Sequence, residues 1–144
     1  AACFIINDDY QLALEVDADG VHIGRDDGAI QRIKQKLGDK ILGVSCYNSL
    51  NLAQQAASEG ADYVAFGRFF ISGTKPDAVA VDIALIRQAK AQLSLPVVGI
   101  GGITAENAHL LVSEGIDAVA VIGGLFHQAD IKQSAQRINK LFTQ

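Results

Sequence analysis

The chain has 144 residues, 49% of them hydrophobic and 19% charged, and a formal net charge of −4 at pH 7. This length and composition predict one folded domain with a hydrophobic core and exclude a disordered chain. The Lys and Arg residues form no cluster, which argues against a nucleic-acid surface, and no apolar run reaches the length of a membrane span. Cys3 and Cys46 have no metal or redox spacing and fit a reduced, cytoplasmic compartment.

Apolar runs of strand type alternate with segments of helical periodicity along the whole chain. We expect strands at 3–6, 21–24, 40–45, 62–67, 96–102 and 117–123, and helices at 10–16, 29–37, 50–59, 82–92, 105–114 and 128–142. Strands that alternate with helices in this way form a parallel sheet with right-handed crossovers.

The same helix-to-strand joint, each time with an Asp, occurs at 18–21, 60–64 and 115–119. This repetition favours a closed barrel over an open sheet. Six βα units do not close an eight-strand barrel, and the chain contains no Met and opens within a predicted strand. We therefore predict an α/β fold of the TIM (β/α)₈ barrel type, in which residues 1–144 form a single domain covering strands three to eight, with the N-terminal part missing.

Two consecutive predicted strands end in glycine pairs, Gly101-Gly102 and Gly123-Gly124. Glycines there let the backbone approach a ligand, and the N–H groups of the turn and the next helix can bind an anion. The pattern is similar to the phosphate site after strands seven and eight of a (β/α)₈ barrel. Two tight turns without a ligand are the alternative, and Thr104 is expected to cap the helix after the first pair.

Carboxylates follow the first two predicted strands, Asp8 and Asp9 after one and Asp26 and Asp27 after the other. The carboxyl ends of neighbouring parallel strands meet at one edge, so these side chains can share a cation. Magnesium fits, because it takes a few carboxylates plus phosphate oxygens of a substrate. N-capping of the following helices is the alternative for both pairs.

Some of the other polar residues are candidates for a binding or catalytic site, and others are not. The segment Ser72-Gly73-Thr74-Lys75 can offer hydroxyls, backbone N–H groups and a positive charge to a phosphate, although a solvated surface lysine is the alternative. We expect His22 to be a satisfied barrel-interior residue and His109 and His127 to lie on the surface. Ser45 has no His/Asp pattern around it, so a nucleophilic triad is not expected, and nothing resembles a zinc site.

A set of short segments matches one family in order and with near-matching spacing over essentially the whole chain. The segments are Phe4-Ile5-Ile6-Asn7-Asp8, Gly20-Val21-His22-Ile23-Gly24, Gly43-Val44-Ser45, Gly60-Ala61-Asp62-Tyr63-Val64, Thr74-Lys75-Pro76, Gly99-Ile100-Gly101-Gly102-Ile103-Thr104 and Asn107-Ala108. Together they resemble thiamine-phosphate synthase. Each segment alone is a weak signal, whereas the ordered set is specific.

The resemblance implies a (β/α)₈ barrel enzyme of thiamine biosynthesis. Such an enzyme is a magnesium-dependent transferase that joins hydroxymethylpyrimidine diphosphate to a thiazole phosphate, in many members a carboxylated one. The products are thiamine monophosphate and pyrophosphate, with carbon dioxide when the thiazole is carboxylated. The resemblance also suggests a homodimer, which nothing in the sequence itself indicates.

The resemblance also assigns roles by position. Asn7 would contact the pyrimidine diphosphate, Asp8 and Asp27 would bind magnesium, and Ser45 and Lys75 would hold the leaving pyrophosphate as the catalytic residues. The thiazole substrate would be bound by Ser72, Gly73 and Thr74, and its phosphate by backbone groups of Gly102, Ile122 and Gly123.

The chain departs from the family pattern at several positions. Many relatives have Gln at Arg25, His at Tyr47, Pro at Arg68, Thr at Ser72 and Ser at Gly123. A family segment of the type Gln-x-Arg-x-Lys, on the second strand, grips the pyrimidine diphosphate and is absent here. We therefore expect residues 1–144 alone to be weakly active or inactive.

Two other functions stay open. The first is the sister thiazole tautomerase, an isomerase on the same barrel that uses a histidine and needs no magnesium. The second is a non-catalytic phosphate-binding module. Asp8, Asp27 and Thr74-Lys75 favour the synthase, because a tautomerase has no diphosphate to hold.

Overall fold

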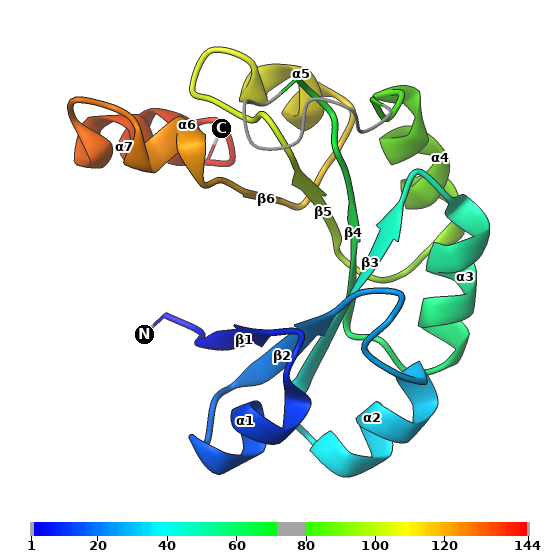
Figure 1. The fold of residues 1–144 in the computed structure, drawn as a ribbon. Helices are drawn as coiled ribbons and strands as arrows, with labels where there is room; N and C mark the ends of the chain where they lie inside the picture. The colour runs from blue at the N-terminus through cyan, green and yellow to red at the C-terminus, as the bar shows by residue number, and fades with distance from the viewer. Residues whose placement is uncertain (1, 72–79, 144) are drawn as a thin grey trace.

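The computed structural model describes residues 2–71 and 80–143 (Figure 1). The strands are β1 (Ile5–Asn7), β2 (Gly20–Ile23), β3 (Ile41–Tyr47), β4 (Tyr63–Phe66), β5 (Val97–Ile100) and β6 (Ala118–Ala120). The helices are α1 (Tyr10–Glu15), α2 (Ile30–Leu37), α3 (Leu50–Ser58), α4 (Ala84–Gln92), α5 (Ala108–Ser113), α6 (Gly123–Phe126) and α7 (Ile131–Lys140). No helix in these two ranges is long and apolar enough to cross a membrane.

The six strands form one parallel sheet in which neighbours in the chain are neighbours in space, from β1 to β6. The sheet curls into an open half-barrel, with α1 to α5 on its convex side (Figure 1). The predicted alternation of strands and helices and the parallel sheet are therefore confirmed. The closed eight-strand barrel stays a prediction, since β1 and β6 are the two edges of the described sheet.

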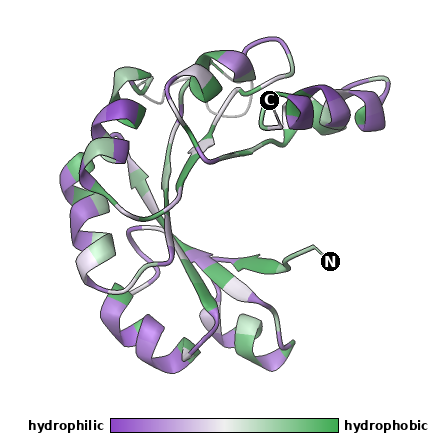
Figure 2. Ribbon diagram, turned by 180° about the vertical axis from the view of Figure 1, so that it is seen from behind, coloured by the Kyte–Doolittle hydropathy of each residue, from purple (hydrophilic) through white to green (hydrophobic). Residues whose placement is uncertain are grey.

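The outer face of the sheet carries the hydrophobic core. Val21, Leu42, Val64 and Val97 alternate with inward-facing residues on four strands and are fully buried under the helices. Figure 2 shows hydrophobic strands and hydrophilic stretches on the helices that cover them. Small side chains on the helices let them pack close to the sheet, and the fully buried ones are Ala13, Ala53, Ala56, Ala89 and Ala108.

The concave face carries a different set of residues. The strand register places Asn7 of β1, His22 of β2, Gly43 of β3 and Tyr63 of β4 in one row. Ser45 lies two residues further along β3, on the same face and nearer the carboxyl end. Polar residues from β1 to β4 thus gather inside the half-barrel near the carboxyl ends of the strands, while fully buried apolar residues such as Val21, Leu42 and Val64 face the helices.

The predicted boundaries are wrong in the last third of the chain. β6 ends at Ala120, so the predicted strand over 117–123 is too long. The chain then forms the short helix α6, and α7 begins only at Ile131, after Asp130 caps it by accepting a hydrogen bond from the Gln133 N–H (2.8 Å). What was expected as one helix over 128–142 is therefore preceded by a separate helical turn.

The turn before α5 also differs from the prediction. Asn107, not Thr104, occupies the N-cap position of α5. The Asn107 side chain accepts a hydrogen bond from the Thr104 N–H (2.8 Å) and donates one to the Gly102 carbonyl (2.9 Å). This amide holds the segment after the first glycine pair as a turn, which delays the start of the helix to Ala108.

The three repeated joints have one structural role. In each, the Asp carboxylate accepts a hydrogen bond from a backbone N–H at the start of the preceding strand. Two of the three carboxylates also pair with a lysine on the helix that comes before that strand. The backbone pairs are Asp19 with Phe4 (2.6 Å), Asp62 with Leu42 (2.8 Å) and Asp117 with Val97 (2.7 Å), and the lysines are Lys34 on Asp62 (2.8 Å) and Lys90 on Asp117 (2.8 Å).

Substitution of Asp62 tests the contribution of this joint to stability. Asp62→Ala leaves the N–H of the buried Leu42 without its acceptor, so the free energy of unfolding should fall by about 1–2 kcal/mol. Urea denaturation of the full-length protein measures the change. Asp39→Ala, in the exposed turn before β3, is the matched control. Equal losses in the two variants would contradict the assigned role.

Candidate active site

The end of β1 places two neighbouring carboxylates in different environments. The Asp9 N–H donates to the Asn7 carbonyl (2.8 Å) and closes a three-residue turn around Asp8, whose φ of +67° is rare for a residue with a side chain. Asp9 caps α1 by accepting a hydrogen bond from the Leu12 N–H (2.9 Å). Among residues 2–71 and 80–143, nothing donates a hydrogen bond to the Asp8 carboxylate. N-capping therefore explains Asp9 and leaves Asp8 for another role.

The loop after β2 turns one carboxylate back toward the strand. Oδ2 of Asp27 accepts a hydrogen bond from the Gly24 N–H (2.6 Å). Asp26 is exposed, and α2 begins at an Ala29 cap that makes no side-chain hydrogen bond, so neither carboxylate caps that helix. One oxygen of Asp27 thus closes the loop, while Oδ1 takes no part in that bond.

His22 joins Ser45 and Tyr63 across three strands. Its Nε2 lies 2.8 Å from the Ser45 hydroxyl and its Nδ1 lies 2.9 Å from the Tyr63 hydroxyl. The two rings are nearly parallel, with centroids 5.5 Å apart. His22 is the satisfied interior residue that was predicted. The sequence prediction for Ser45 missed this histidine, because 23 residues separate the two in the chain.

The Ser45–His22 pair is not a nucleophilic triad, because the third member is a phenol and not a carboxylate. Burial lowers the pKa of His22 below its usual value, and the nearby charges of Asp8 and Asp27 act in the opposite direction. The negative charges of Asp8 and Asp27 therefore both favour the protonated form of the His22 imidazole. Burial also raises the pKa of Tyr63, which keeps the phenol protonated at neutral pH.

The first glycine pair serves chain packing. Gly101 and Gly102 have φ values of +98° and +67°, a region that disfavours other residues. A methyl group on Gly101 would overlap the Arg68 side chain, and one on Gly102 would lie 2.5 Å from the Phe70 carbonyl oxygen. The Phe70 N–H in turn donates to the Gly101 carbonyl (3.0 Å). Packing alone therefore accounts for both glycines, whether or not a ligand binds.

The two glycines of the second pair have different surroundings. A methyl group on Gly124 would overlap the Ile103 carbonyl, whereas one on Gly123 would meet only the His127 ring, at 3.3 Å. Ile122 is exposed at the N-cap position of α6. The structure thus brings Gly102, Ile122 and Gly123 to one part of the fold, through the contact of Gly124 with Ile103.

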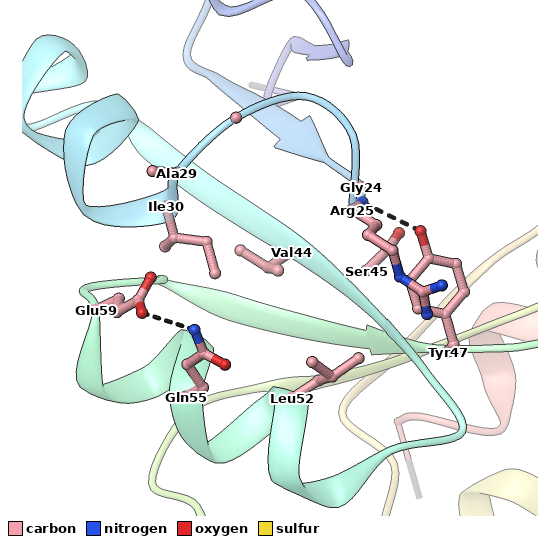
Figure 3. Close-up of a pocket in the computed structure, with 11 residues that line it drawn as sticks. Gly24, Arg25, Ala29, Ile30, Val44, Ser45, Tyr47, Leu52, Gln55 and Glu59 are labelled. Carbon is pink, nitrogen blue, oxygen red and sulfur yellow. Dashed lines mark hydrogen bonds between the residues drawn. The ribbon is translucent and has the colours of Figure 1, made fainter.

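A cavity of about 270 Å³ lies beside the row of polar residues, between α2, α3 and the end of β3 (Figure 3). Arg25 and Tyr47 stand at one end: the Arg25 N–H donates to the Tyr47 hydroxyl (3.2 Å) and the guanidinium lies 4.9 Å from the ring centroid. Ser45 lines the cavity, whereas Asn7, Asp8 and Asp27 lie outside it.

Several predicted site residues are not covered by the structure. Ser72, Gly73, Thr74 and Lys75 lie outside the described residues, so the roles expected for them stay predictions.

Within residues 2–71 and 80–143, no cluster of three or more His, Cys, Asp or Glu residues could hold a metal ion. Cys46 is buried, and burial raises the pKa of its thiol to about 12, so it is no nucleophile at neutral pH.

Comparison with known proteins gives a family. Residues 1–125 match the family model described as thiamine monophosphate synthase. The chain is 60% identical over 139 residues to a thiamine-phosphate synthase from Methylobacillus flagellatus and 50% identical over 139 residues to one from Thiobacillus denitrificans. The chain belongs to the thiamine monophosphate synthase family. In each case the match covers 96% of the chain and 66% of the relative, so the chain spans just under two thirds of the length of these curated relatives.

Solved structures agree with this family. A thiamine phosphate pyrophosphorylase from Pyrococcus furiosus superposes with a TM-score of 0.89 at 34% identity, over 99% of this chain and 68% of that one. A 3-hexulose-6-phosphate synthase from Salmonella typhimurium superposes with a TM-score of 0.71 at 22% identity, over 93% of this chain and 66% of that one, and shows a shared fold alone. The curled parallel sheet is therefore the fold of the thiamine monophosphate synthase family.

The two glycines after β6 give a matched pair of substitutions. Gly124→Ala should lower the free energy of unfolding by about 1–3 kcal/mol, because its methyl group overlaps the backbone of Ile103. Gly123→Ala should be nearly neutral, because its methyl group would meet only the exposed His127 ring, which can shift, and because the position is helical. Urea denaturation of both variants measures the difference, and similar losses would contradict this account of the second pair.

The buried imidazole predicts a pH dependence of stability. The folded pKa of His22 lies below the ordinary histidine pKa of 6.5, so near that pH the unfolded chain binds this proton more readily than the folded one. The free energy of unfolding should therefore decrease as the pH falls from 6.5 toward the folded pKa. Urea denaturation in metal-free buffer measures it, with His22→Gln as control. Identical pH profiles for wild type and His22→Gln would contradict the prediction.

Proposed function

We propose that the complete protein is a thiamine-phosphate synthase, which couples hydroxymethylpyrimidine diphosphate to a thiazole phosphate in thiamine biosynthesis. The observation that carries the proposal is the gathering of Asn7, Asp8, Asp27 and Ser45 around His22 at the carboxyl end of neighbouring strands. Active sites of parallel barrels lie at this end. The 60% identity to a thiamine-phosphate synthase gives independent support.

We further propose that this sheet is part of a closed eight-strand barrel. β1 and β6 are its edges, and exposed apolar side chains lie beside each of them: Phe4 at one, and Ile122 and Phe126 at the other. An uncovered strand edge with such neighbours needs a partner. About a third of each relative's length lies outside the segment matched here, which is enough for two further βα units.

The residues near Ser45 suit the diphosphate half of the reaction. Asn7 and Ser45 offer polar side chains from β1 and β3, on either side of His22. Lys75 would add a positive charge to the leaving pyrophosphate, as the family pattern suggests. In the reaction the bond from the pyrimidine methylene carbon to the diphosphate oxygen breaks, and the thiazole nitrogen forms a new bond to that carbon. Holding the two substrates in line would supply much of the rate.

Asp8 and Asp27 fit a magnesium ion. The Asp8 backbone N–H donates a hydrogen bond to the His22 carbonyl (2.7 Å), which fixes the position of Asp8. Within the described residues, the Asp8 carboxylate accepts no hydrogen bond. Asp27 keeps Oδ1 available while Oδ2 binds Gly24. Two carboxylates are enough for magnesium when substrate phosphate oxygens complete its shell. Bound there, the ion would neutralise negative charge on the departing pyrophosphate.

The thiazole phosphate is proposed to bind near the glycine pairs. Gly123 has no backbone obstacle on its Cα side, only the exposed His127 ring, and Gly102 and Ile122 lie close by through the packing of Gly124 on Ile103. Ser72, Gly73 and Thr74 would contact the thiazole ring. Because packing explains Gly101, Gly102 and Gly124 without a ligand, this half of the site rests mainly on family likeness. The homodimer and the cytoplasmic location likewise stay predictions.

Calorimetric titration of the full-length protein with the pyrimidine diphosphate, with and without magnesium, tests the proposal. Magnesium should strengthen binding, and Asp8→Asn or Asp27→Asn should each weaken magnesium-dependent binding by at least about tenfold, the equivalent of about 1.4 kcal/mol. Asp26→Asn is the matched control, because Asp26 is an exposed neighbour of Asp27. The Asn side chain keeps an oxygen that can accept from Gly24, so the loop should persist.

The alternatives predict different results. No binding of the diphosphate by a folded full-length protein would contradict the synthase and favour the tautomerase or a non-catalytic module. Binding that is the same with and without magnesium, and unchanged in both Asn variants, would contradict the proposed metal site alone. Residues 1–144 tested beside the full-length protein would show whether the remaining part of the chain is needed.

A further inference from the structure

Tyr63 reaches His22 because the residue between them has no side chain. His22, Gly43 and Tyr63 are register partners on three neighbouring strands. A methyl group on Gly43 would overlap the Tyr63 ring, so the phenol lies across β3 in the space that glycine leaves. This placement brings the Tyr63 hydroxyl to Nδ1 of His22, while Nε2 on the other side of the ring meets Ser45.

The proton on the imidazole decides what Ser45 can do. A neutral imidazole has one donor nitrogen and one acceptor nitrogen. If Nε2 accepts from the Ser45 hydroxyl, the serine has only lone pairs left for a ligand. If Nε2 donates to Ser45 Oγ, the serine keeps its own proton to donate elsewhere. Only the second arrangement lets Ser45 bind an anionic oxygen.

Tyr63 selects between the two arrangements. The Tyr63 hydroxyl can donate or accept, but within the described residues its hydrogen-bond partner is Nδ1 of His22, so donation to Nδ1 is the arrangement that gives the phenol hydrogen an acceptor. Donation from Tyr63 makes Nδ1 the acceptor and places the imidazole proton on Nε2, facing Ser45. Proton donation thus runs in one direction, from Tyr63 through His22 to Ser45.

We propose that Tyr63 and His22 are positioning residues that hold the Ser45 hydroxyl as a hydrogen-bond donor toward an anionic oxygen ligand at the carboxyl end of β3. The ligand is a diphosphate oxygen if the proposed function is right, and in that respect the inference rests on it. The direction of the relay rests only on the contacts among the three side chains. The low pKa of His22 and the high pKa of Tyr63, both caused by burial, fit neutral partners throughout.

The protonation of His22 tests the relay without any ligand. Nitrogen NMR of the full-length protein with ¹⁵N-labelled histidine, at about pH 8 where the imidazole is neutral, identifies the protonated nitrogen. His22→Gln assigns the signal by its loss. The relay predicts a proton on Nε2 in the wild type and a shift toward the other tautomer in Tyr63→Phe. A proton on Nδ1 in the wild type would overturn the proposal.

Affinity for inorganic pyrophosphate with magnesium tests the consequence for Ser45. Ser45→Ala should weaken binding by about tenfold, and Tyr63→Phe, which keeps the ring, by about three- to tenfold. The double variant should bind no more weakly than Ser45→Ala alone, because Tyr63 acts only through the serine hydroxyl. Tyr10→Phe, on α1 away from the relay, should bind as the wild type does.

The two measurements separate this inference from the proposed function. An Nε2 proton together with no pyrophosphate binding by the wild type would support the relay and contradict the synthase. Pyrophosphate binding that is unaffected by Tyr63→Phe, or fully additive losses in the double variant, would overturn the positioning role and leave the synthase in place. Thermal unfolding of each variant shows whether a loss of affinity reflects a loss of fold.

Discussion

The register of the parallel sheet is the constraint on which the site depends. It aligns Asn7, His22, Gly43 and Tyr63 in one row across four strands. A slip by one residue would turn every one of these side chains toward the helices. Gly43 then converts alignment into contact, since the space above it is occupied by the Tyr63 ring. The polar interior follows from backbone pairing, which does not depend on any ligand. One sheet can therefore serve as both scaffold and site.

The two ends of the sheet have separate tasks. At the amino end, Asp19, Asp62 and Asp117 each bind the backbone at the start of a neighbouring strand, with Lys34 and Lys90 supporting two of them. These hydrogen bonds and ion pairs hold the strands in position. At the carboxyl end, Asp8 adopts a positive φ and Asp27 closes a loop, both near His22.

The glycine pairs show how one pattern can have two causes. Their position after consecutive strands predicts a phosphate site, and the family likeness agrees. The structure adds a packing reason for Gly101, Gly102 and Gly124, whose methyl groups would meet Arg68, Phe70 and Ile103. Gly123 is the member of the two pairs without a backbone obstacle. A motif read from sequence does not separate these causes, because close approach to another segment and close approach to a ligand both demand a missing side chain.

The sequence by itself determined the alternation of strands and helices, the parallel sheet, the candidates Asp8, Asp27 and Ser45, and the likeness to the family, because hydrophobic period, helix-ending glycines and short ordered motifs are local properties. The residue pattern alone could not separate Asp8 from Asp9, since both follow β1; the family likeness favoured Asp8, and only the fold shows Asp9 as a helix cap. The sequence missed the partner of Ser45, because Ser45 and His22 meet through strand register and not through nearby positions in the chain. Only the tertiary structure decided that contact, since it depends on which residues of β2, β3 and β4 stand opposite one another and on the open space above Gly43.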